Sequence, residues 1–465
     1  MRAPFSSGRL SLRGPVAVLS VIAFAAAAAA CGSSSKSSSS SATTAPAATT
    51  APAAVDKSYG TGVTANSIKI GIAIVDFAPI QQFVDFNHGD EQKIDQVFID
   101  NINKNGGIGG KKLDVVYQKY TPIGSTFPTQ VCTSMTEDKK VFAVLGNIED
   151  PTGASQLCVS KQHHTILIGH DMTDTELLGA DPNGLMLTPD IAAERRLNAL
   201  LALVKSQGTL NGKTVATLAE TSTKDRISKV ITPALKDMGV KTGTNAVLDV
   251  GGTTDTTAAQ AQLDSFIERW KNEGVNAIII SGADVVANQF VTKLSKQMPG
   301  TLLLTDSTSS AGGSAQDNVA AHVNPNPYEG MLTANGLPDQ QAFEEANMQK
   351  CVKEYETATG ETVVSPENLK PGPDGKRVQV WVAISDICRE LTMFQQIAAK
   401  IGPYLNNTNW VNAVDSLGTV KDLPSSQYAS LKTGKYDADD SFALAKFQSA
   451  KNDFVPISPI QNIAS

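Results

Sequence analysis

The segment INKNGGIGGKKLDVV, residues 102–116, is the most informative about the fold, because it joins a predicted helix to a predicted strand through four glycines. Residues 91–105 repeat apolar side chains at helical spacing, and residues 111–117 form the apolar run of a strand. A phosphate-binding loop has the opposite order, because its anion binds the N–H groups of a helix that begins after the glycines. We therefore expect residues 106–110 to form a left-handed helix cap and a tight turn, without a ligand.

The rest of the chain continues this alternation of helices and strands. Four stretches repeat apolar residues at the spacing i, i+3, i+4, i+7, beginning at Leu197, Leu263, Ala287 and Met348. Between the helices, nearly continuous apolar runs predict strands that are covered on both faces, as in parallel sheets. These runs are residues 67–75, 111–117, 141–146, 165–169, 214–219, 277–281 and 301–305. The pattern predicts two α/β units, followed by helices and a tail of short strands and turns.

The first thirty residues have the pattern of an export signal. Three arginines precede an apolar run from Val16 to Ala30, which is too short and alanine-rich for a membrane span. Cys31 follows three alanines, as in a lipobox, although Ala28 stands where leucine is usual. We expect cleavage before Cys31 and lipidation of its thiol; the alternative is a plain secretory signal cleaved near Ala30.

Residues 31–59 are nearly all Ser, Thr, Ala and Pro, which cannot bury enough apolar surface to fold, so we expect a tether. The formal net charge of −7 argues against nucleic acid as a partner, since phosphate binding needs basic clusters.

Four cysteines remain for an oxidising compartment and allow three pairings. Their placement favours Cys132 with Cys158 and Cys351 with Cys388, with buried free thiols as the alternative.

Three phrases together resemble the Leu/Ile/Val-binding family of substrate-binding proteins for ABC transporters. They are GVTANSIKIGI (62–72), NKNGGIGGKKLDVVYQKY (103–120) and VFAVLG (141–146). The resemblance implies the type I periplasmic-binding-protein fold: two Rossmann-like lobes with parallel sheets, joined by a three-crossover hinge. It implies that residues 60–189 and 328–421 form lobe 1, and that residues 190–327 and 422–465 form lobe 2.

Ligands of such folds lie beyond the carboxyl ends of the strands. The segment HDMTDTEL (170–177) matches the family's carboxylate-binding loop, which implies contacts from Asp171 and Thr173. The preceding loop, NIEDPTGAS (147–155), occupies the place of a serine-rich segment and adds Asp150 and Thr152. The other strand ends contribute Asp76, Phe77, Thr221, Ser222, Asp284 and Asp306. The polar residues that open helices have a plainer alternative as helix caps, and Phe77 as a packing residue at the lobe edge.

The second lobe departs from the amino-acid binders, since residues 220–225 contain no aromatic residue to cover a ligand. The ligand class is therefore open, with the acidic loops favouring a polar or amine-bearing solute. No zinc-site spacing and no nucleophile elbow occurs in the sequence, so we expect neither a metal, a cofactor nor an enzyme activity. A carboxylate-based hydrolase stays a third hypothesis, because the pairing of its acids would be spatial.

These patterns predict an exported, lipid-anchored, monomeric protein on the outer face of the cytoplasmic membrane. Its partners would be a small-molecule ligand (amino-acid-like, an amide or an amine) and an ABC permease, with membrane contact only through the lipid. The alternative is a sensor or surface interaction lipoprotein that uses the same fold without transport.

Overall fold

The computed structural model describes residues 55–464, apart from 82–85, 123–125, 151, 171, 174–176, 178, 180–183, 251–256 and 283. These residues belong to one unit, Ala53–Ser465. The expected signal, Cys31 and most of the tether lie outside the described residues. Among the described helices, none is both long enough and apolar enough to cross a bilayer.

The first sheet has five parallel strands. Their order is β3 (Lys112–Tyr120), β1 (Ser67–Val75), β4 (Ala143–Leu145), β5 (Ile166–Ile168) and β6 (Met186–Leu187). In β1, the consecutive residues Ile72, Ala73 and Ile74 are almost fully buried, as expected for a strand with helices on both faces.

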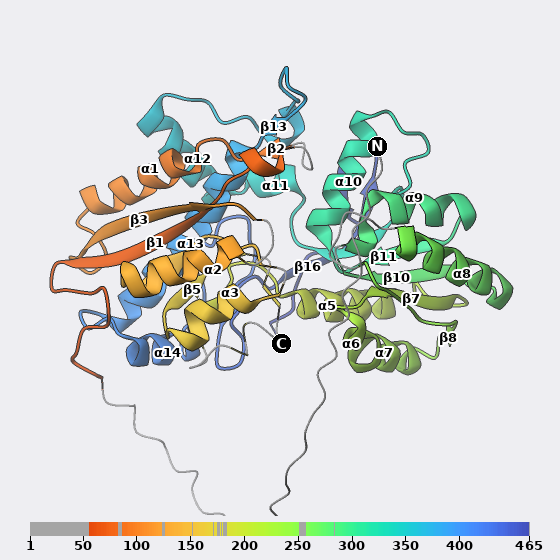
Figure 1. Ribbon diagram of the computed structural model, residues 1–465, viewed down its shortest axis with the longest axis horizontal. Coiled ribbons are helices and arrows are strands. Elements are labelled where there is room, and N and C mark those ends of the chain that lie inside the picture. Colours follow the sequence, from red (N-terminus) through yellow and green to blue (C-terminus); the bar gives the residue numbers. More distant parts are fainter. Residues whose placement is uncertain are drawn as a thin grey trace, which may run out of the picture. The chain divides into compact units, whose positions relative to one another are not determined.

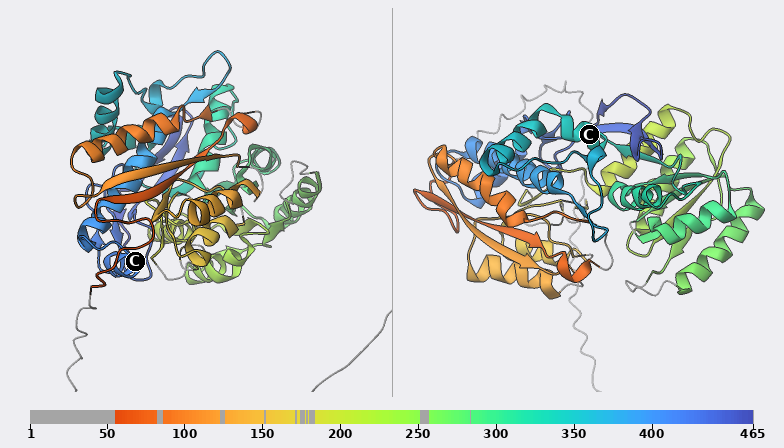
Figure 2. Two further views of the ribbon diagram at one scale, coloured as in Figure 1. Left: turned by 60° about the vertical axis from the view of Figure 1, so that its left-hand side comes forward. Right: turned by 90° about the horizontal axis from the view of Figure 1, so that it is seen from above.

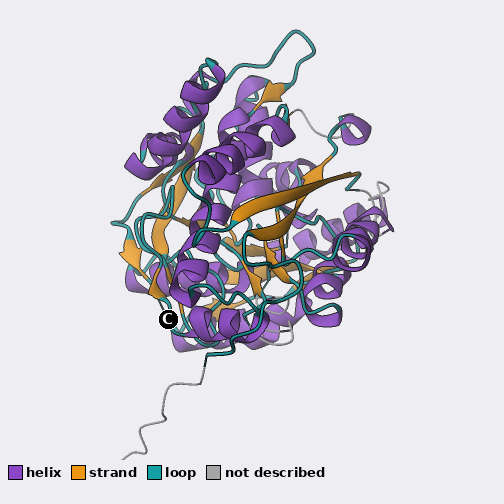
Figure 3. Ribbon diagram, turned by 90° about the vertical axis from the view of Figure 1, so that its left-hand side faces the viewer, coloured by secondary structure: helices purple, strands orange, loops and turns teal. Residues whose placement is uncertain are grey.

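Helices cover this sheet on both faces, as Figures 1 and 3 show. One group contains α1 (Glu91–Lys104), α12 (Ala346–Thr359) and α13 (Val380–Ile401), which pack on one another. On the other face lie α2 (Thr126–Thr133) and α3 (Ala154–Leu157). Figure 2 shows the late helices beside the early strands, so the chain returns to this sheet after building the second one. The helices α11 (Asp339–Glu344) and α14 (Asn407–Asp415) complete this side, and two π-helical turns, Ser134–Asp138 and Cys158–Gln162, continue α2 and α3.

The second sheet is larger and mixed. Its central path is β17 (Asp453–Pro456), β16 (Ser441–Gln448), β12 (Leu332–Asn335), β11 (Leu302–Thr305), β10 (Ala277–Ser281), β7 (Thr214–Glu220) and β8 (Lys241–Thr242). Two further strands, β9 (Ala246–Leu248) and β18 (Gln461–Asn462), pair with β7 and β16. The pairs from β12 to β8 are parallel, whereas β16 runs antiparallel to β12 and β17.

Two separate apolar clusters bury the faces of this sheet. One contains residues of α8 (Thr257–Glu273), α9 (Asn288–Gln297) and α10 (Thr308–Ala320). The other contains residues of α5 (Ala193–Ser206) and α7 (Thr232–Asp237). The short α6 (Lys224–Arg226) leads through a π-helical turn, Ile227–Ile231, into α7. Among the described residues there are also three 3-10 turns, Ala78–Ile80, Asp284–Val286 and Pro366–Asn368. Two small ladders pair β2 (Phe86–Asn87) with β13 (Arg377–Val378), and β14 (Gly418–Thr419) with β15 (Ser430–Leu431).

All seven predicted strands are present, and the predicted segments 67–75 and 277–281 coincide with β1 and β10. The four predicted helical stripes lie in α5, α8, α9 and α12. The strand β12 was not predicted, because LTAN has only one large apolar side chain.

The opening glycines form the predicted helix cap and turn. Gly106 and Gly107 have φ of +102° and +77°, and the Gly107 N–H donates to the Ile102 carbonyl at 2.8 Å. A side chain on Gly107 would lie 2.0 Å from the Lys111 carbonyl oxygen, so the turn requires glycine there. The prediction that these glycines cap a helix is confirmed.

Sheet membership corrects two of the expected lobe boundaries. Residues 328–421 were assigned to lobe 1, but β12 pairs with β11 in the second sheet, so the second crossover follows Asn335. Residues 422–465 were assigned to lobe 2, but Leu423, Leu431 and Tyr436 are buried in the core of the first sheet. The continuous apolar run of β16 begins only at Phe442, which puts the third crossover near residues 438–441.

Both disulfides in the structure lie in the lobe of the first sheet. Cys132 is bonded to Cys158 across a Cα–Cα distance of 6.1 Å, and Cys351 to Cys388 across 6.4 Å. The first pair links α2 to the start of the π-helical turn after α3, and the second links α12 to α13. These are the pairings that the sequence favoured.

Candidate functional site

A cavity of about 720 Å³ is lined by residues from the elements of both sheets. The first sheet contributes the carboxyl ends of its strands through Ala73, Gly146 and His170, and α13 contributes a long run of residues. From the second side, Thr308 and Gln316 of α10 line it. Its volume is in the range of sites for small organic molecules.

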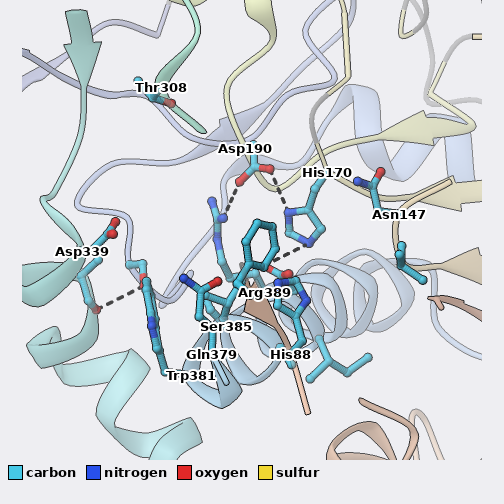
Figure 4. A pocket seen from close by; sticks show the side chains of 18 of the residues that line it. His88, Asn147, His170, Asp190, Thr308, Asp339, Gln379, Trp381, Ser385 and Arg389 are labelled. Atoms are coloured by element: carbon cyan, nitrogen blue, oxygen red, sulfur yellow. Dashed lines mark hydrogen bonds and ion pairs between the residues drawn. The ribbon is translucent and has the colours of Figure 1, made fainter. Parts of the chain in front are cut away.

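His170 lies at the polar centre of the cavity, next to Asp190 (Figure 4). It is 9% exposed. Its Nδ1 lies 2.8 Å from an Asp190 carboxylate oxygen, and its Nε2 lies 3.1 Å from Glu390 Oε1 and 3.7 Å from Asp386 Oδ1. The Arg389 guanidinium forms an ion pair with Asp190 on its other side and donates to the Pro189 carbonyl at 2.7 Å. One buried histidine is thus surrounded by three carboxyl groups.

This grouping shifts the ionisation of its members. Burial alone would lower the pKa of His170, but the charges of Asp386 and Asp190 raise it well above its usual value. Burial would raise the pKa of Asp190, but Arg389 and His170 hold it far below its usual range. Burial raises the pKa of Glu390 to about 7, against the opposing effects of His170 and the Gly146 N–H. Glu390 therefore titrates near neutral pH.

An aromatic wall lies on the first-sheet side of the cavity. The rings of Phe77, Phe86 and His88 contact one another, with centroid distances of 4.9 to 5.9 Å. His88 Nδ1 lies 3.1 Å from a Glu91 carboxylate oxygen. Trp381 of α13 also lines the cavity and packs edge-on against Phe343. These half-buried rings offer a ligand both apolar contact and the negative faces of π systems.

Each crossover between the sheets places one aspartate at the cavity. Asp190 lies at the first crossover, Asp339 just after the second, and Asp439 at the third. The crossing segments also bond to one another, since the Ala438 N–H donates to the Thr188 carbonyl at 2.8 Å. Burial raises the pKa of both Asp339 and Asp439. The hinge itself is therefore part of the cavity wall.

Of the residues predicted from the sequence, Phe77 is the one whose described side chain lines this cavity. Asp76 accepts a hydrogen bond from the Ala78 N–H at 3.2 Å and does not line the cavity. Asp171 and the side chain of Asp284 lie outside the described residues. Thr173 is half-buried near this region but is not in the lining.

The polar groups of Asp150 and Thr152 form hydrogen bonds within the protein. The Asp150 carboxylate accepts hydrogen bonds from the Thr152 and Ser155 N–H groups at 2.9 and 3.0 Å, and from both hydroxyls. Burial opposes ionisation, but these bonds lower the pKa of Asp150 to about 2. Neither residue lines the cavity. This agrees with the alternative from the sequence, in which the two residues serve only as helix caps.

The candidates of the second lobe also have internal partners. The Thr221 hydroxyl donates to the Leu248 carbonyl at 3.3 Å, and Ser222 is exposed. Asp306 is 4% exposed and accepts from Arg226 at 3.0 Å, the Ser281 hydroxyl at 2.5 Å and the Gly282 N–H at 3.1 Å. None of these three residues lines the cavity. As ligand contacts, they and Thr173 stay predictions.

The residues that do line the site include charged groups that sequence reasoning missed. Asp386, Arg389 and Glu390 are spaced i, i+3, i+4 on α13, a helix whose buried residues are otherwise apolar except for Ser385. Charges at core positions of a helix are costly unless they are paired or functional, and this signal was present in the sequence. His170, at the end of a predicted strand, was noted but not connected to them, because the pairing crosses more than two hundred residues.

The fold and the cavity together define a two-lobed binding protein, and the family comparison agrees. The chain matches the family described as "Periplasmic binding protein" over residues 96–369, more than half of its length. The chain belongs to this family. No curated protein sequence matches it.

Solved structures of similar fold are distant in sequence. A fatty acid ABC transporter substrate-binding protein from Thermomonospora curvata is 16% identical, with a TM-score of 0.57, covering 88% of this chain and 95% of that one. A solute-binding protein from Rhodopseudomonas palustris BisB5, in complex with 3,4-dihydroxybenzoic acid, is 13% identical with a TM-score of 0.57, covering 86% and 98%. The branched-chain amino acid binding protein LivJ from Streptococcus pneumoniae, in complex with isoleucine, is 14% identical with a TM-score of 0.53, covering 85% and 100%. At these identities the likeness establishes the fold.

Proposed function

We propose that this protein is an extracytoplasmic solute-binding protein that captures a small polar molecule between its lobes and delivers it to an ABC permease. The observation that carries the proposal is the cavity of about 720 Å³, whose lining combines strand ends of the first sheet with α10 of the second. A ligand that contacts both sides stabilises the closed arrangement by its differential affinity for the two states. The three crossovers supply the hinge.

The cleft also bears on the kind of solute. The solved relatives bind a hydroxylated aromatic acid and an amino acid, and one is named for fatty acids. In this chain the polar centre is a histidine surrounded by carboxyl groups, which favours an amide or amine over a carboxylic acid. A sensor that uses the same lobes without transport remains the second function.

A thermal-shift screen tests the binding function. The soluble chain should begin at residue 32, because Asp56 already bonds to Asn409 and belongs to the folded unit. A solute at a hundredfold over its Kd should stabilise the fold by about 2.7 kcal/mol. The screen should cover amino acids, amides, amines, aromatic acids and sugars; a complete lack of shifts at millimolar concentration contradicts the proposal.

We further propose export, lipidation of Cys31 and a monomeric body held to the membrane by the acyl chain and the tether. The composition of residues 1–59 supports this proposal. Intact mass of the membrane-extracted protein should show a diacyl modification that Cys31→Ala abolishes. Non-reducing peptide mapping should recover Cys132 with Cys158 and Cys351 with Cys388, and any other pairing would contradict the disulfides.

A further inference from the structure

The charge of the cavity lining is strongly one-sided. It contains nine acidic side chains, three arginines and no lysine among the described residues. Two of the arginines have acidic partners: Arg389 is paired with Asp190, and Arg377 donates to Asp317 at 3.1 Å. His170 lies beside Asp190, Asp386 and Glu390, and His88 lies beside Glu91, but the acids still outnumber the basic groups. Such a lining attracts positive solutes and repels anions.

Asp95 is the clearest case of a buried acid without a partner. It lines the cavity from α1 and is 6% exposed, and its carboxyl group has no hydrogen bond or ion pair within the described part of the chain. Buried polar groups are nearly always paired, so this one requires an explanation. Burial, and then the charges of Glu91, Glu390 and Asp386, raise its pKa well above the usual value.

Glu390, on the neighbouring helix α13, is a second buried acid with an oxygen that lacks a hydrogen-bond donor among the described residues. It is 1% exposed, and one oxygen accepts from the Gly146 N–H at 3.0 Å. The other oxygen, Oε1, lies within ion-pair distance of His170 but has no partner in hydrogen-bond geometry among the described residues, and the same holds for His170 Nε2. The helices α1 and α13 pack together, both residues line the cavity, and the charge of Glu390 contributes to the raised pKa of Asp95, so the two carboxyl groups lie within electrostatic range of each other.

The nine lining acids come from several elements, among them α1, α11, α13 and β17. Within the described ranges, the His, Cys, Asp and Glu group with the spacing of metal ligands is Cys132, Cys158 and His163, whose two sulfurs are bonded to each other. Spread carboxylates beside aromatic rings suit an organic cation with N–H donors. Carboxylates accept those hydrogen bonds, and the rings contact the carbon body and attract the charge through their faces.

Building on the solute-binding function, we propose that the cleft takes a protonated amine without a carboxylate of its own. The ammonium group binds the carboxylates of Asp95 and Glu390. The apolar body lies against the rings of Phe77, Phe86 and Trp381. A zwitterionic amino acid fits less well, because its carboxylate would face the same acids.

Titration calorimetry with probes that share one body and differ in the head group tests this proposal. The probes are 2-phenylethylamine, 2-phenylethanol and 3-phenylpropionate, with agmatine and isoleucine added, measured on residues 32–465. We expect the amines to bind at least tenfold more tightly than the alcohol, the acid and isoleucine. In Asp95→Asn, amine binding should weaken at least tenfold, while the matched exposed variant Asp114→Asn keeps the affinity of the parent protein.

The other outcomes separate the two proposals. If isoleucine, the alcohol or the acid binds and the amines do not, the amine class is wrong but solute binding stands. If amines bind equally to the parent protein and to Asp95→Asn, the assignment of Asp95 is wrong. If neither these probes nor any solute of the wider screen binds, the binding function fails, and the amine proposal fails with it.

Discussion

Two buried aspartates, Asp306 and Asp95, show how differently the two sides of this molecule use the same side chain. Asp306 follows β11 of the second sheet and is 4% exposed; Asp95 lies on α1 beside the first sheet and is 6% exposed. The carboxylate of Asp306 accepts from a guanidinium, a hydroxyl and a backbone N–H. Asp95 has no such donor among the described residues. Equal burial therefore does not mean an equal role.

The hydrogen bonds of a buried acid indicate whether it belongs to the fold or to a site. A carboxylate whose acceptors are filled contributes to stability and has no capacity left for a ligand. A carboxylate left without donors reduces stability, and its retention points to a partner that arrives from outside. The comparison can be tested by changing each residue and measuring the unliganded protein.

The largest effect is expected for Asp306→Ala. Removal of this carboxylate leaves the half-buried Arg226 with Glu194 as its remaining acid, at 3.1 Å, and leaves the Ser281 hydroxyl without its acceptor. Breaking a buried ion pair from one side costs about 3 to 5 kcal/mol. Urea unfolding should show this loss, while Asp225→Asn, on the exposed start of the same helix as Arg226, should leave the midpoint unchanged. A midpoint for Asp306→Ala equal to that of the parent protein would contradict the structural role of Asp306.

The fold was predictable because its signal is local and repeated. The spacing in α5, α8, α9 and α12 and the apolar runs of β1 and β10 identify two layered sheets from short windows of sequence. The glycine turn between α1 and β3 adds the order of the elements. The weak strands, such as β12, escaped because their partners supply most of their stabilisation.

The site was mostly not predictable, because its groups meet only in three dimensions. Asp150, Thr152 and Asp306 lie at strand ends, where ligands of this fold bind. However, the carboxylate of Asp150 already accepts hydrogen bonds from Thr152, and that of Asp306 already accepts one from the Gly282 N–H. His170 and Glu390 approach each other from segments 220 residues apart. The one available signal was the charged triplet of α13, and single-sequence reasoning does not reveal which face of that helix meets the cavity.

A second test measures how the stability of the unliganded protein depends on pH through Glu390, a buried acid of the cavity. Glu390 ionises above about pH 4.5 when unfolded but near 7 when folded, so the folded state holds more protons in that window. The stability of the unliganded protein should therefore fall as pH rises from about 5 to 7. The raised pKa of His170 acts in the same direction, since its contribution is present at low pH and is lost as pH rises through the folded pKa. The shift of Glu390 corresponds to roughly 3 kcal/mol at 1.36 kcal/mol per pKa unit.

Glu390→Gln should flatten this dependence, and the exposed variant Glu367→Gln should retain it. The groups that face Glu390 are His170, Asp386, Asp95 and the Gly146 N–H, and all are retained in both variants. Chemical unfolding at half-unit pH steps gives the profile. Equal slopes for Glu390→Gln and the parent protein would mean that Glu390 is not the group that titrates.

The smallest expected effect on stability is that of Asp95→Asn. It distinguishes the two aspartates most directly, because its sign is opposite to that of the effect of Asp306→Ala. Asp95→Asn removes a buried carboxyl group that must ionise without a donor, so the unliganded protein should gain about 1 kcal/mol at pH 8. The raised pKa of Asp95 means that the unfolded chain ionises first, so this gain should shrink as pH falls towards 4. Asp114→Asn, an exposed change of the same chemistry on β3, should leave stability unchanged at both pH values. A loss of stability in Asp95→Asn would show that Asp95, like Asp306, serves the fold, and the comparison between them would no longer hold.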